Sequence, residues 1–193
     1  MKFHYSILII LLINAFLNSN RMVNSLDCLI YNKQYKYEYL YQSTEINTLD
    51  MYGSKVYIFP LKNLFNLDTI RWSLFLTSDN STFFFKSFLS DEYLCSSPKH
   101  LDESNLRRLL YTTPIREGKN CEWKLIKVNS SSQKNGESYL IINAYYNEQM
   151  YAPSFFFKKD KDRRNIYLWY DNKKLDFSSN FRWVVECLNF GPK

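Results

Sequence analysis

The chain has 193 residues, of which 46% are hydrophobic and 23% are charged, and its formal net charge is +6. Aromatic residues make up 18% of it and glycines number only four, so a disordered, collagen-like or glycine-linker protein is excluded. The length fits one folded domain. The only histidines are His4 and His100, which are too few for a zinc cluster or a Ser–His–Asp triad once a leader containing His4 is removed. We therefore expect no enzymatic activity, no metal and no cofactor.

Residues 1–25 have the features of a secretory signal peptide. Lys2 gives a positive start, and residues 6–17 form an apolar run of 12 residues. A bilayer span needs about 20 apolar residues, so this run fits the hydrophobic core of a signal peptide better than a membrane helix. An uncleaved anchor is the alternative interpretation.

Val23 and Ser25 fit a small-residue cleavage pattern, which makes Leu26 the expected first mature residue, and Ser19 marks an alternative cleavage site. We expect residues 26–193 to form a single secreted, extracellular domain that is monomeric and does not span a membrane.

The charge of the mature chain is mildly basic and evenly spread. Removal of the leader leaves 23 basic and 19 acidic residues, a net charge of +4. Acidic residues are interleaved with the basic ones, so the basic residues do not form the continuous stripe that is typical of nucleic-acid-binding proteins. We therefore expect no nucleic-acid partner. The densest cluster, residues 158–164, contains two Asp residues. It is interpreted either as a solvated hairpin loop or as a contact for a sulfated glycan or another anionic surface.

Cysteines and sequons also favour a secreted protein. The mature chain has an even number of cysteines, which predicts two disulfides in an oxidising compartment, with three pairings open. They are Cys28, Cys95, Cys121 and Cys187. Two glycosylation sequons begin at Asn80 and Asn129, each in a polar stretch between apolar segments.

Three units of about 50 residues repeat along the chain, at residues 28–76, 79–128 and 138–187. Each contains four short segments rich in aromatic and β-branched residues, which predict strands. In chain order these strands are expected near residues 28–32, 39–41, 55–59 and 71–74; then 82–88, 93–95, 108–111 and 122–125; then 139–146, 150–152, 165–169 and 182–185. The spacings between corresponding strands agree within three residues.

Twelve short strands in three equivalent units predict an all-β protein with a β-trefoil fold, in which six strands close a barrel and six form hairpins that cap it. The last strand of each unit carries a Trp, and we expect Trp72, Trp123 and Trp183 to fill the core at equivalent positions. Trp169 lies outside this pattern. It is interpreted either as part of the packing of the cap or as a platform for a ligand.

The predicted barrel also selects a disulfide pairing. A closed barrel brings its first and last strands together, so we expect Cys28 to pair with Cys187. Cys95 then pairs with Cys121 and joins strands two and four of the middle unit.

The third unit resembles a known family. The segments NAYYNE at 143–148, MYA at 150–152, DRR at 162–164 and RWV at 182–184 are similar to the small secreted Cys- and Trp-rich salivary proteins of blood-feeding Diptera. Those proteins are β-trefoils whose nearest structural relatives are ricin-type lectins. The resemblance implies a secreted, non-enzymatic protein that binds a glycan or an extracellular host protein.

The chain departs from ricin-type lectins at the motif that binds sugar. Sugar-binding repeats of that type close with Gln-x-Trp, whereas the position two residues before the Trp is here Ile70, Cys121 or Phe181. The hydrogen-bonding part of the lectin site is therefore not carried over.

A ligand site, if one exists, is expected on the third unit. Aromatic side chains there lie close in sequence to carboxylate, amide and guanidinium groups that can bond to sugar hydroxyls. The predicted ligand-binding residues are Asn143, Tyr146, Asp162, Arg164 and Trp169. Hairpin ends on a rigid barrel commonly hold binding residues.

Protease inhibition is the alternative function, because soybean Kunitz-type inhibitors are also two-disulfide trefoils of similar size. The loop at residues 112–119 would present Arg116 to a trypsin-like protease. A plain turn between two strands is the other interpretation of this loop.

Overall fold

The computed structural model describes residues 25–46, 53–63, 66–100, 107–116, 118–128, 137–154, 163–169 and 175–188. Their regular structure consists of antiparallel strands and short 3-10 helices, which confirms an all-β fold. Residues 1–24, which make up all but the last residue of the expected leader at 1–25, lie outside the described residues, as does the sequon residue Asn129.

The strands fall into three successive sets. The first set comprises β1 (Leu26–Asn32), β2 (Glu38–Ile46), β3 (Ser54–Pro60) and β4 (Arg71–Leu76). The second comprises β5 (Phe83–Ser87), β6 (Tyr93–His100), β7 (Arg107–Thr113) and β8 (Trp123–Val128). The third comprises β9 (Ser138–Asn143), β10 (Gln149–Tyr151), β11 (Arg164–Asn165), β12 (Tyr167–Trp169) and β13 (Arg182–Leu188).

The described residues thus contain thirteen strands where the sequence predicted twelve. The difference arises in the third set, because Ile166 separates β11 from β12. β11 pairs with β3 and β12 pairs with β7, so the two short strands have different neighbours. A single segment that turns from one neighbour to another loses its ladder pairing at the residue between them.

Short 3-10 helices precede the last strand of each set. They are η2 (Leu67–Ile70), η3 (Lys119–Cys121) and η5 (Ser179–Phe181), and η1 (Leu61–Asn63) follows β3. The final residues of η2, η3 and η5 are Ile70, Cys121 and Phe181, and all three are buried. These are the positions at which ricin-type repeats carry glutamine, and burial explains why they are apolar here.

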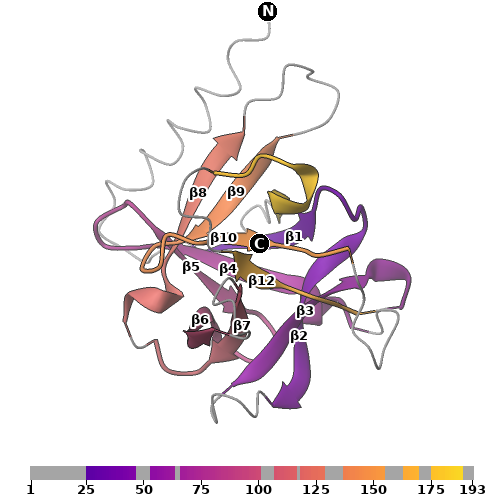
Figure 1. Ribbon diagram of the computed structural model, residues 1–193. Coiled ribbons are helices and arrows are strands. Elements are labelled where there is room, and N and C mark those ends of the chain that lie inside the picture. Colours follow the sequence, from indigo (N-terminus) through magenta and orange to yellow (C-terminus); the bar gives the residue numbers. More distant parts are fainter. Residues whose placement is uncertain are drawn as a thin grey trace, which may run out of the picture.

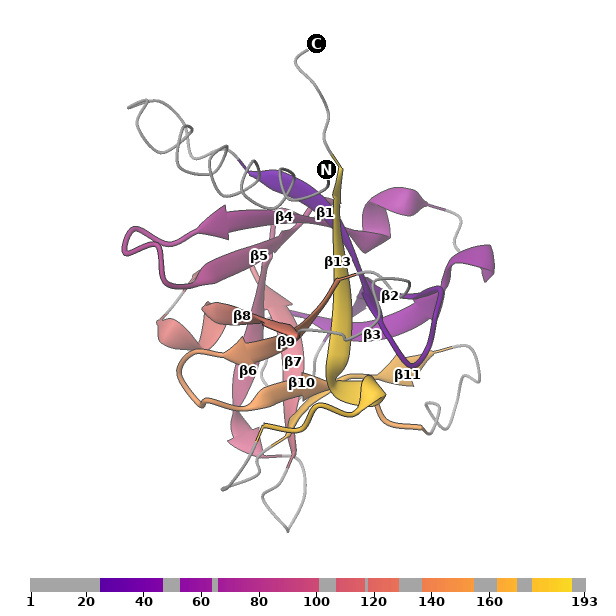
Figure 2. The same cartoon turned by 90° about the horizontal axis from the view of Figure 1, so that it is seen from above.

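Six strands form a closed ring of antiparallel pairs, in the order β1, β4, β5, β8, β9, β13 and back to β1. Figure 2 shows β13 running alongside β1, so the two ends of the described chain are neighbours. The pairs β2–β3, β6–β7 and β10–β12 form the hairpins, and β7 joins both β3 and β12. Figure 1 shows the β2–β3 hairpin and the β8–β9 pair at opposite ends of the view.

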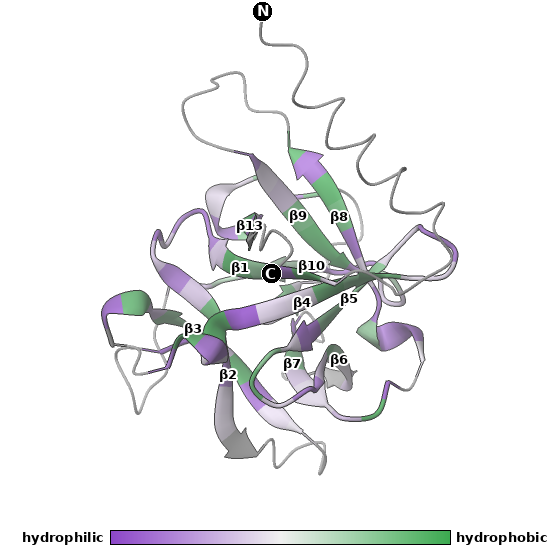
Figure 3. Ribbon diagram, turned by 180° about the vertical axis from the view of Figure 1, so that it is seen from behind, coloured by the Kyte–Doolittle hydropathy of each residue, from purple (hydrophilic) through white to green (hydrophobic). Residues whose placement is uncertain are grey.

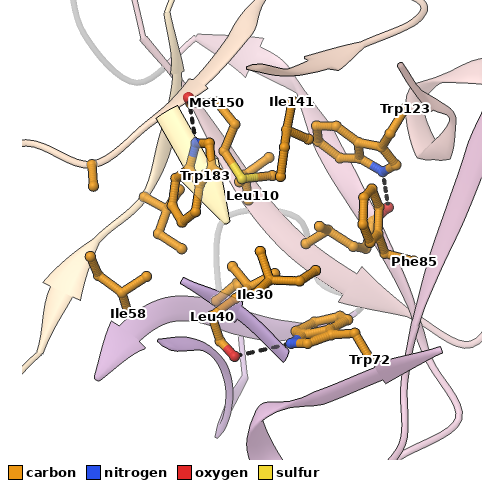
Figure 4. Close-up of a cluster of buried hydrophobic side chains, with 14 of the residues drawn as sticks. Ile30, Leu40, Ile58, Trp72, Phe85, Leu110, Trp123, Ile141, Met150 and Trp183 are labelled. Carbon is orange, nitrogen blue, oxygen red and sulfur yellow. Dashed lines mark hydrogen bonds between the residues drawn. The ribbon is translucent and has the colours of Figure 1, made fainter. Parts of the chain in front are cut away.

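The core is built around three indole rings. Trp72, Trp123 and Trp183 are fully buried. Each donates a hydrogen bond from Nε1 to a backbone carbonyl in the second strand of its own set, at Leu40 (3.0 Å), Leu94 (2.9 Å) and Met150 (2.9 Å) (Figure 4). A buried indole N–H needs such an acceptor, so the same contact recurs three times.

Hydrophobic residues are concentrated on strands such as β5, β8 and β9, and polar residues gather at turns (Figure 3).

The structure contains the two predicted disulfides, Cys28–Cys187 between β1 and β13 and Cys95–Cys121 between β6 and η3. Both are compatible with folding in an oxidising compartment. The second disulfide ends on Cys121, the last residue of η3, two residues before β8 begins. It therefore joins the second strand of the middle set to the helix that precedes the fourth strand, where we had expected it to join the two strands themselves.

Candidate functional site

Asn143, a predicted ligand residue, is fully buried at the end of β9. Its side-chain nitrogen donates to the carbonyl of Asn120 at 2.8 Å. Its side-chain oxygen accepts from the backbone N–H groups of Tyr145 (3.2 Å) and Tyr146 (3.1 Å). Asn143 therefore fixes the turn between β9 and β10, and its polar atoms are engaged within the protein.

Arg164 is also buried, with 3% of its surface exposed. Its Nε and Nη2 atoms donate to the two carboxylate oxygens of Glu38, at 3.0 and 3.2 Å. Nη1 donates to the carbonyl of Pro153 at 2.9 Å, and the guanidinium lies 3.7 Å from the centroid of the Tyr35 ring. The guanidinium thus joins the third set of strands to the first and supports Tyr35.

Tyr146 packs against a guanidinium that is paired with a glutamate, as Tyr35 does, and this second contact joins the second set of strands to the third. The guanidinium of Arg108 is 3.7 Å from the Tyr146 ring centroid and bonds to both oxygens of Glu148, at 3.0 and 3.2 Å. Buried charges of this kind need such partners. The predicted residues Arg164 and Tyr146 therefore belong to two separate inter-set contacts.

A third contact joins the first set to the second. Glu92 accepts hydrogen bonds from the side-chain nitrogen of Gln42 at 2.7 Å and from the hydroxyl of Thr112 at 2.5 Å. Glu38, Glu92 and Glu148 each lie two residues before a core residue that accepts the bond of a Trp indole. A glutamate at the same position of all three units is a signal in the sequence from which these contacts could have been predicted.

Trp169 is half-buried beside the remaining aromatic residues of the third set. Its ring lies edge-on to Tyr151, with centroids 5.6 Å apart and planes at 69°. Tyr151 stacks on Phe181, with centroids 5.2 Å apart and planes at 24°. Trp169 therefore takes part in packing and holds Tyr151 in place. The fifth predicted residue, Asp162, lies outside the described residues.

A cavity of about 340 Å³ opens where the first and third sets meet. It is open to solvent, and its volume lies at the lower end of the range for small-ligand pockets. The lining residues come from the turn after β1, from the end of β10 with the segment that follows it, and from the helix η5: Gln34, Tyr35, Tyr151, Pro153, Ser154 and Asn180.

Two of the lining residues are the tyrosines that Arg164 and Trp169 support. Burial raises the pKa of Tyr151 above its ordinary value, so its hydroxyl stays protonated at physiological pH. The lining also includes the side-chain amides of Gln34 and Asn180 and the hydroxyl of Ser154, which carry no charge at physiological pH. The pocket thus offers aromatic surface and neutral hydrogen-bonding groups.

The backbone around the pocket is held firmly. The carbonyl of Asn180 accepts from the side chain of Asn32 at 2.9 Å and from the N–H of Ala152 at 3.0 Å. The hydroxyl of Ser179 donates to the side-chain oxygen of Gln34. Within the described part of the chain, the side-chain nitrogens of Gln34 and Asn180 have no hydrogen-bond partner. No described residue therefore competes with a ligand for these two nitrogens.

The predicted inhibitor loop has a different character. Arg116 is exposed, but its guanidinium lies 4.2 Å from the centroid of the Phe84 ring, so its planar face packs against the protein.

Among the described residues, no group of three or more His, Cys, Asp or Glu side chains is placed to hold a metal ion. Within the same ranges, no helix has the length and apolar character needed to cross a membrane.

No family model matches the chain, and no curated protein matches its sequence. Solved structures match its fold. A designed threefold-symmetric protein, ThreeFoil, aligns with a TM-score of 0.58 at 12% identity over 84% of this chain and 99% of its own. A salivary protein from Culex of the Cysteine and Tryptophan-Rich family aligns with a TM-score of 0.56 at 14% identity, over 86% and 95% of the two chains.

A lectin from Polyporus squamosus, solved with a sialylated epitope bound, aligns with a TM-score of 0.61 at 10% identity. It matches 86% of this chain and 50% of its own. At these identities the likeness shows the fold alone. The chain therefore has a β-trefoil-like fold that it shares with salivary, lectin and designed proteins.

Proposed function

We propose that this protein is a secreted, non-enzymatic binding protein that takes a glycan in the pocket between its first and third units. The observation that carries the proposal is the lining of that pocket. Two tyrosine rings lie beside side-chain amides whose nitrogens are unpaired among the described residues. Aromatic surface and neutral hydrogen-bond donors are the groups that sugar rings and their hydroxyls require.

The site lies close to the one predicted from the sequence but uses different residues. Arg164 and Trp169 act from behind the pocket wall, since Arg164 packs on Tyr35 and Trp169 packs on Tyr151. The residues facing the ligand are Gln34, Tyr35 and Asn180 together with Tyr151 and Ser154. A pocket whose walls are fixed before binding loses less conformational entropy when a ligand enters.

The proposal includes the maturation and architecture of the chain. Residues 1–25 serve as a signal peptide, and residues 26–193 form one monomeric β-trefoil domain in which β11 and β12 together act as a single interrupted strand. The two disulfides support a secreted protein, as does the shared fold of the Culex salivary protein. By analogy with that protein, we propose action in saliva on a glycan or an extracellular host molecule.

Binding to a glycan array tests the proposal, with the secreted wild-type protein compared with Gln34→Ala and Asn180→Ala. Each variant removes one unpaired amide donor, so we expect a loss of affinity of about fivefold for the bound glycans. Tyr145→Ala is the matched control, because Tyr145 is well exposed on an equivalent turn and does not line the pocket. Thermal melts confirm that all three variants fold.

The proposed function fails if no glycan on the array binds. The pocket assignment fails if glycans bind but the two pocket variants retain wild-type affinity. It also fails if Tyr145→Ala weakens binding as much as they do.

A further inference from the structure

Tyr37 has an unusual backbone conformation in the turn that supplies Gln34 and Tyr35 to the pocket. Its φ is +72°, in the left-handed region. The equivalent residues in the other two units, each directly before the inter-unit glutamate, are Asp91 (φ +63°) and Asn147 (φ +56°). Asp and Asn enter this region readily, whereas a bulky residue there is an outlier.

The turn requires this backbone conformation, whereas the tyrosine ring that it carries is mostly exposed. The turn is fixed by hydrogen bonds from the N–H of Glu38 to the carbonyl of Tyr35 (2.9 Å) and from the N–H of Leu61 to the carbonyl of Tyr37 (3.0 Å). The Tyr37 side chain is 58% exposed, and the ammonium of Lys36 lies 5.1 Å from its ring centroid. An Asn or Asp would serve the turn with less strain.

Backbone strain that folding does not need is concentrated at functional sites in proteins. We infer that Tyr37 is a further ligand-contacting residue outside the pocket, and that the pocket therefore takes an oligosaccharide whose outer sugars pass over the turn at Tyr37. This inference rests on the proposed glycan-binding function. Two residues span at most about 7 Å, so the Tyr37 and Tyr35 backbones are within the reach of neighbouring sugars.

Lys36 adds a donor at the same place. Its ammonium lies over the Tyr37 ring, 5.1 Å from the centroid, so a sugar that contacts this ring would come within reach of a charged hydrogen-bond donor. The equivalent turns of the other units lack this pair, since they carry Ser90–Asp91 and Tyr146–Asn147 at the corresponding positions. The outer contact is therefore specific to the turn that borders the pocket.

The test uses Tyr37→Asn, which gives this turn the residue found at position 147. The probes are galactose, N-acetylglucosamine and mannose, each presented alone and as the terminal sugar of tri- and tetrasaccharides. We expect wild-type protein to bind the longer forms of its preferred sugar at least fivefold more tightly than the single sugar. In Tyr37→Asn this advantage of length should fall about fivefold, with binding of the single sugar unchanged.

The same variant should be more stable, with a Tm raised by about 2–4 °C, because the strain is relieved. Asn147→Tyr is the matched control, and it should lower the Tm by a similar amount without changing binding. Tyr37→Phe keeps the ring and should retain the advantage of length.

The inference is overturned if Tyr37→Asn binds the oligosaccharides as wild type does, or if it is no more stable than wild type. Loss of single-sugar binding in Tyr37→Asn would also contradict it, because Tyr37 would then belong to the pocket itself. If no probe binds, the inference fails as well, whereas the proposed function fails only when no glycan on the array binds.

Discussion

Arg164, which is buried, and Glu38, which is mostly buried, form a two-point ion pair that joins the third unit of the chain to the first, 126 residues apart. Arg108 and Glu148 repeat the contact between the second unit and the third. Between the first and second units no guanidinium takes part: Glu92 accepts from the neutral side chain of Gln42 in the first unit and from that of Thr112 in its own unit. Polar contacts thus hold the three hairpins together around an otherwise apolar core.

Removing one member of a buried pair leaves an uncompensated charge, so Arg164→Ala should destabilise the protein by about 3 kcal/mol. The carbonyl of Pro153 would lose its donor as well. The free energy of unfolding, measured in urea, checks this prediction. Lys127→Ala is the control, because its ion pair with Glu137 is exposed and should contribute no more than about 0.5 kcal/mol. Equal effects of the two variants would contradict a structural role for Arg164.

The architecture was largely predictable because its determinants repeat. Each unit has a Trp near its end at similar spacing, and this repetition indicates that the same core position recurs in all three units. The disulfide pairing followed from the neighbourhood of the first and last strands. The break at Ile166 was not predictable, because it depends on which strands lie on either side of that segment.

The ligand site was only partly predictable, because composition does not distinguish a polar residue that faces solvent from one that bonds inside. Asn143 and Arg164 have the chemistry of ligand-binding residues, but the fold uses that chemistry for a turn and an ion pair. Gln34 and Asn180 carry no motif. They lie close together because β1 and β13 are neighbours. These two strands are at opposite ends of the domain in sequence, so local patterns could not predict that the two residues line one pocket.

Trp169 should contribute to both stability and binding, because it holds Tyr151 against the pocket. Trp169→Ala removes a half-buried ring and should cost about 2 kcal/mol of unfolding free energy, less than a fully buried Trp would. Glycan affinity should fall as Tyr151 loses its support. Urea unfolding and the array together check this. A variant of wild-type stability would show that Trp169 is not packed as the structure places it.

The two disulfides should differ in their contribution to stability. The Cys28–Cys187 bridge spans 159 residues and the Cys95–Cys121 bridge spans 26. In the chain-entropy model these loops correspond to about 5 and about 3.5 kcal/mol. Replacing each pair by Ala in turn should therefore lower the free energy of unfolding more for the first pair. Non-reducing peptide mapping checks the pairing, and a Cys28–Cys95 peptide would contradict it.

Asn80 lies exposed at the turn between β4 and β5, with φ +57°, a conformation that Asn adopts readily. We predict that it is glycosylated in a secretory host, since the sequon residue Thr82 follows two positions later. The mass of the secreted protein should fall on treatment with peptide-N-glycosidase, and Asn80→Gln should remove the modification at that site. An unmodified Asn80 peptide by mass spectrometry would contradict the prediction.

Stability should decline at alkaline pH, because burial and hydrogen bonds to carboxylates raise the pKa of two tyrosine hydroxyls in the folded protein. Burial, and then a hydrogen bond to Glu137, raise the pKa of Tyr139 from its ordinary value near 10 to about 12. Burial and a bond to Glu186 likewise raise the pKa of Tyr31. Below pH 10 these hydroxyls are protonated in both the folded and the unfolded chain, so they add no pH dependence there.

Between pH 10 and 12 the unfolded chain releases the Tyr139 proton while the folded chain retains it, so the free energy of unfolding falls as the pH rises. We expect the Tm to drop across this window. The drop should be smaller in Tyr139→Phe, which cannot ionise, and smaller again in a Tyr31→Phe, Tyr139→Phe double variant. Melts followed by circular dichroism at half-unit steps of pH measure it. If both Phe variants lose stability as steeply as wild type, neither hydroxyl is held protonated by the fold.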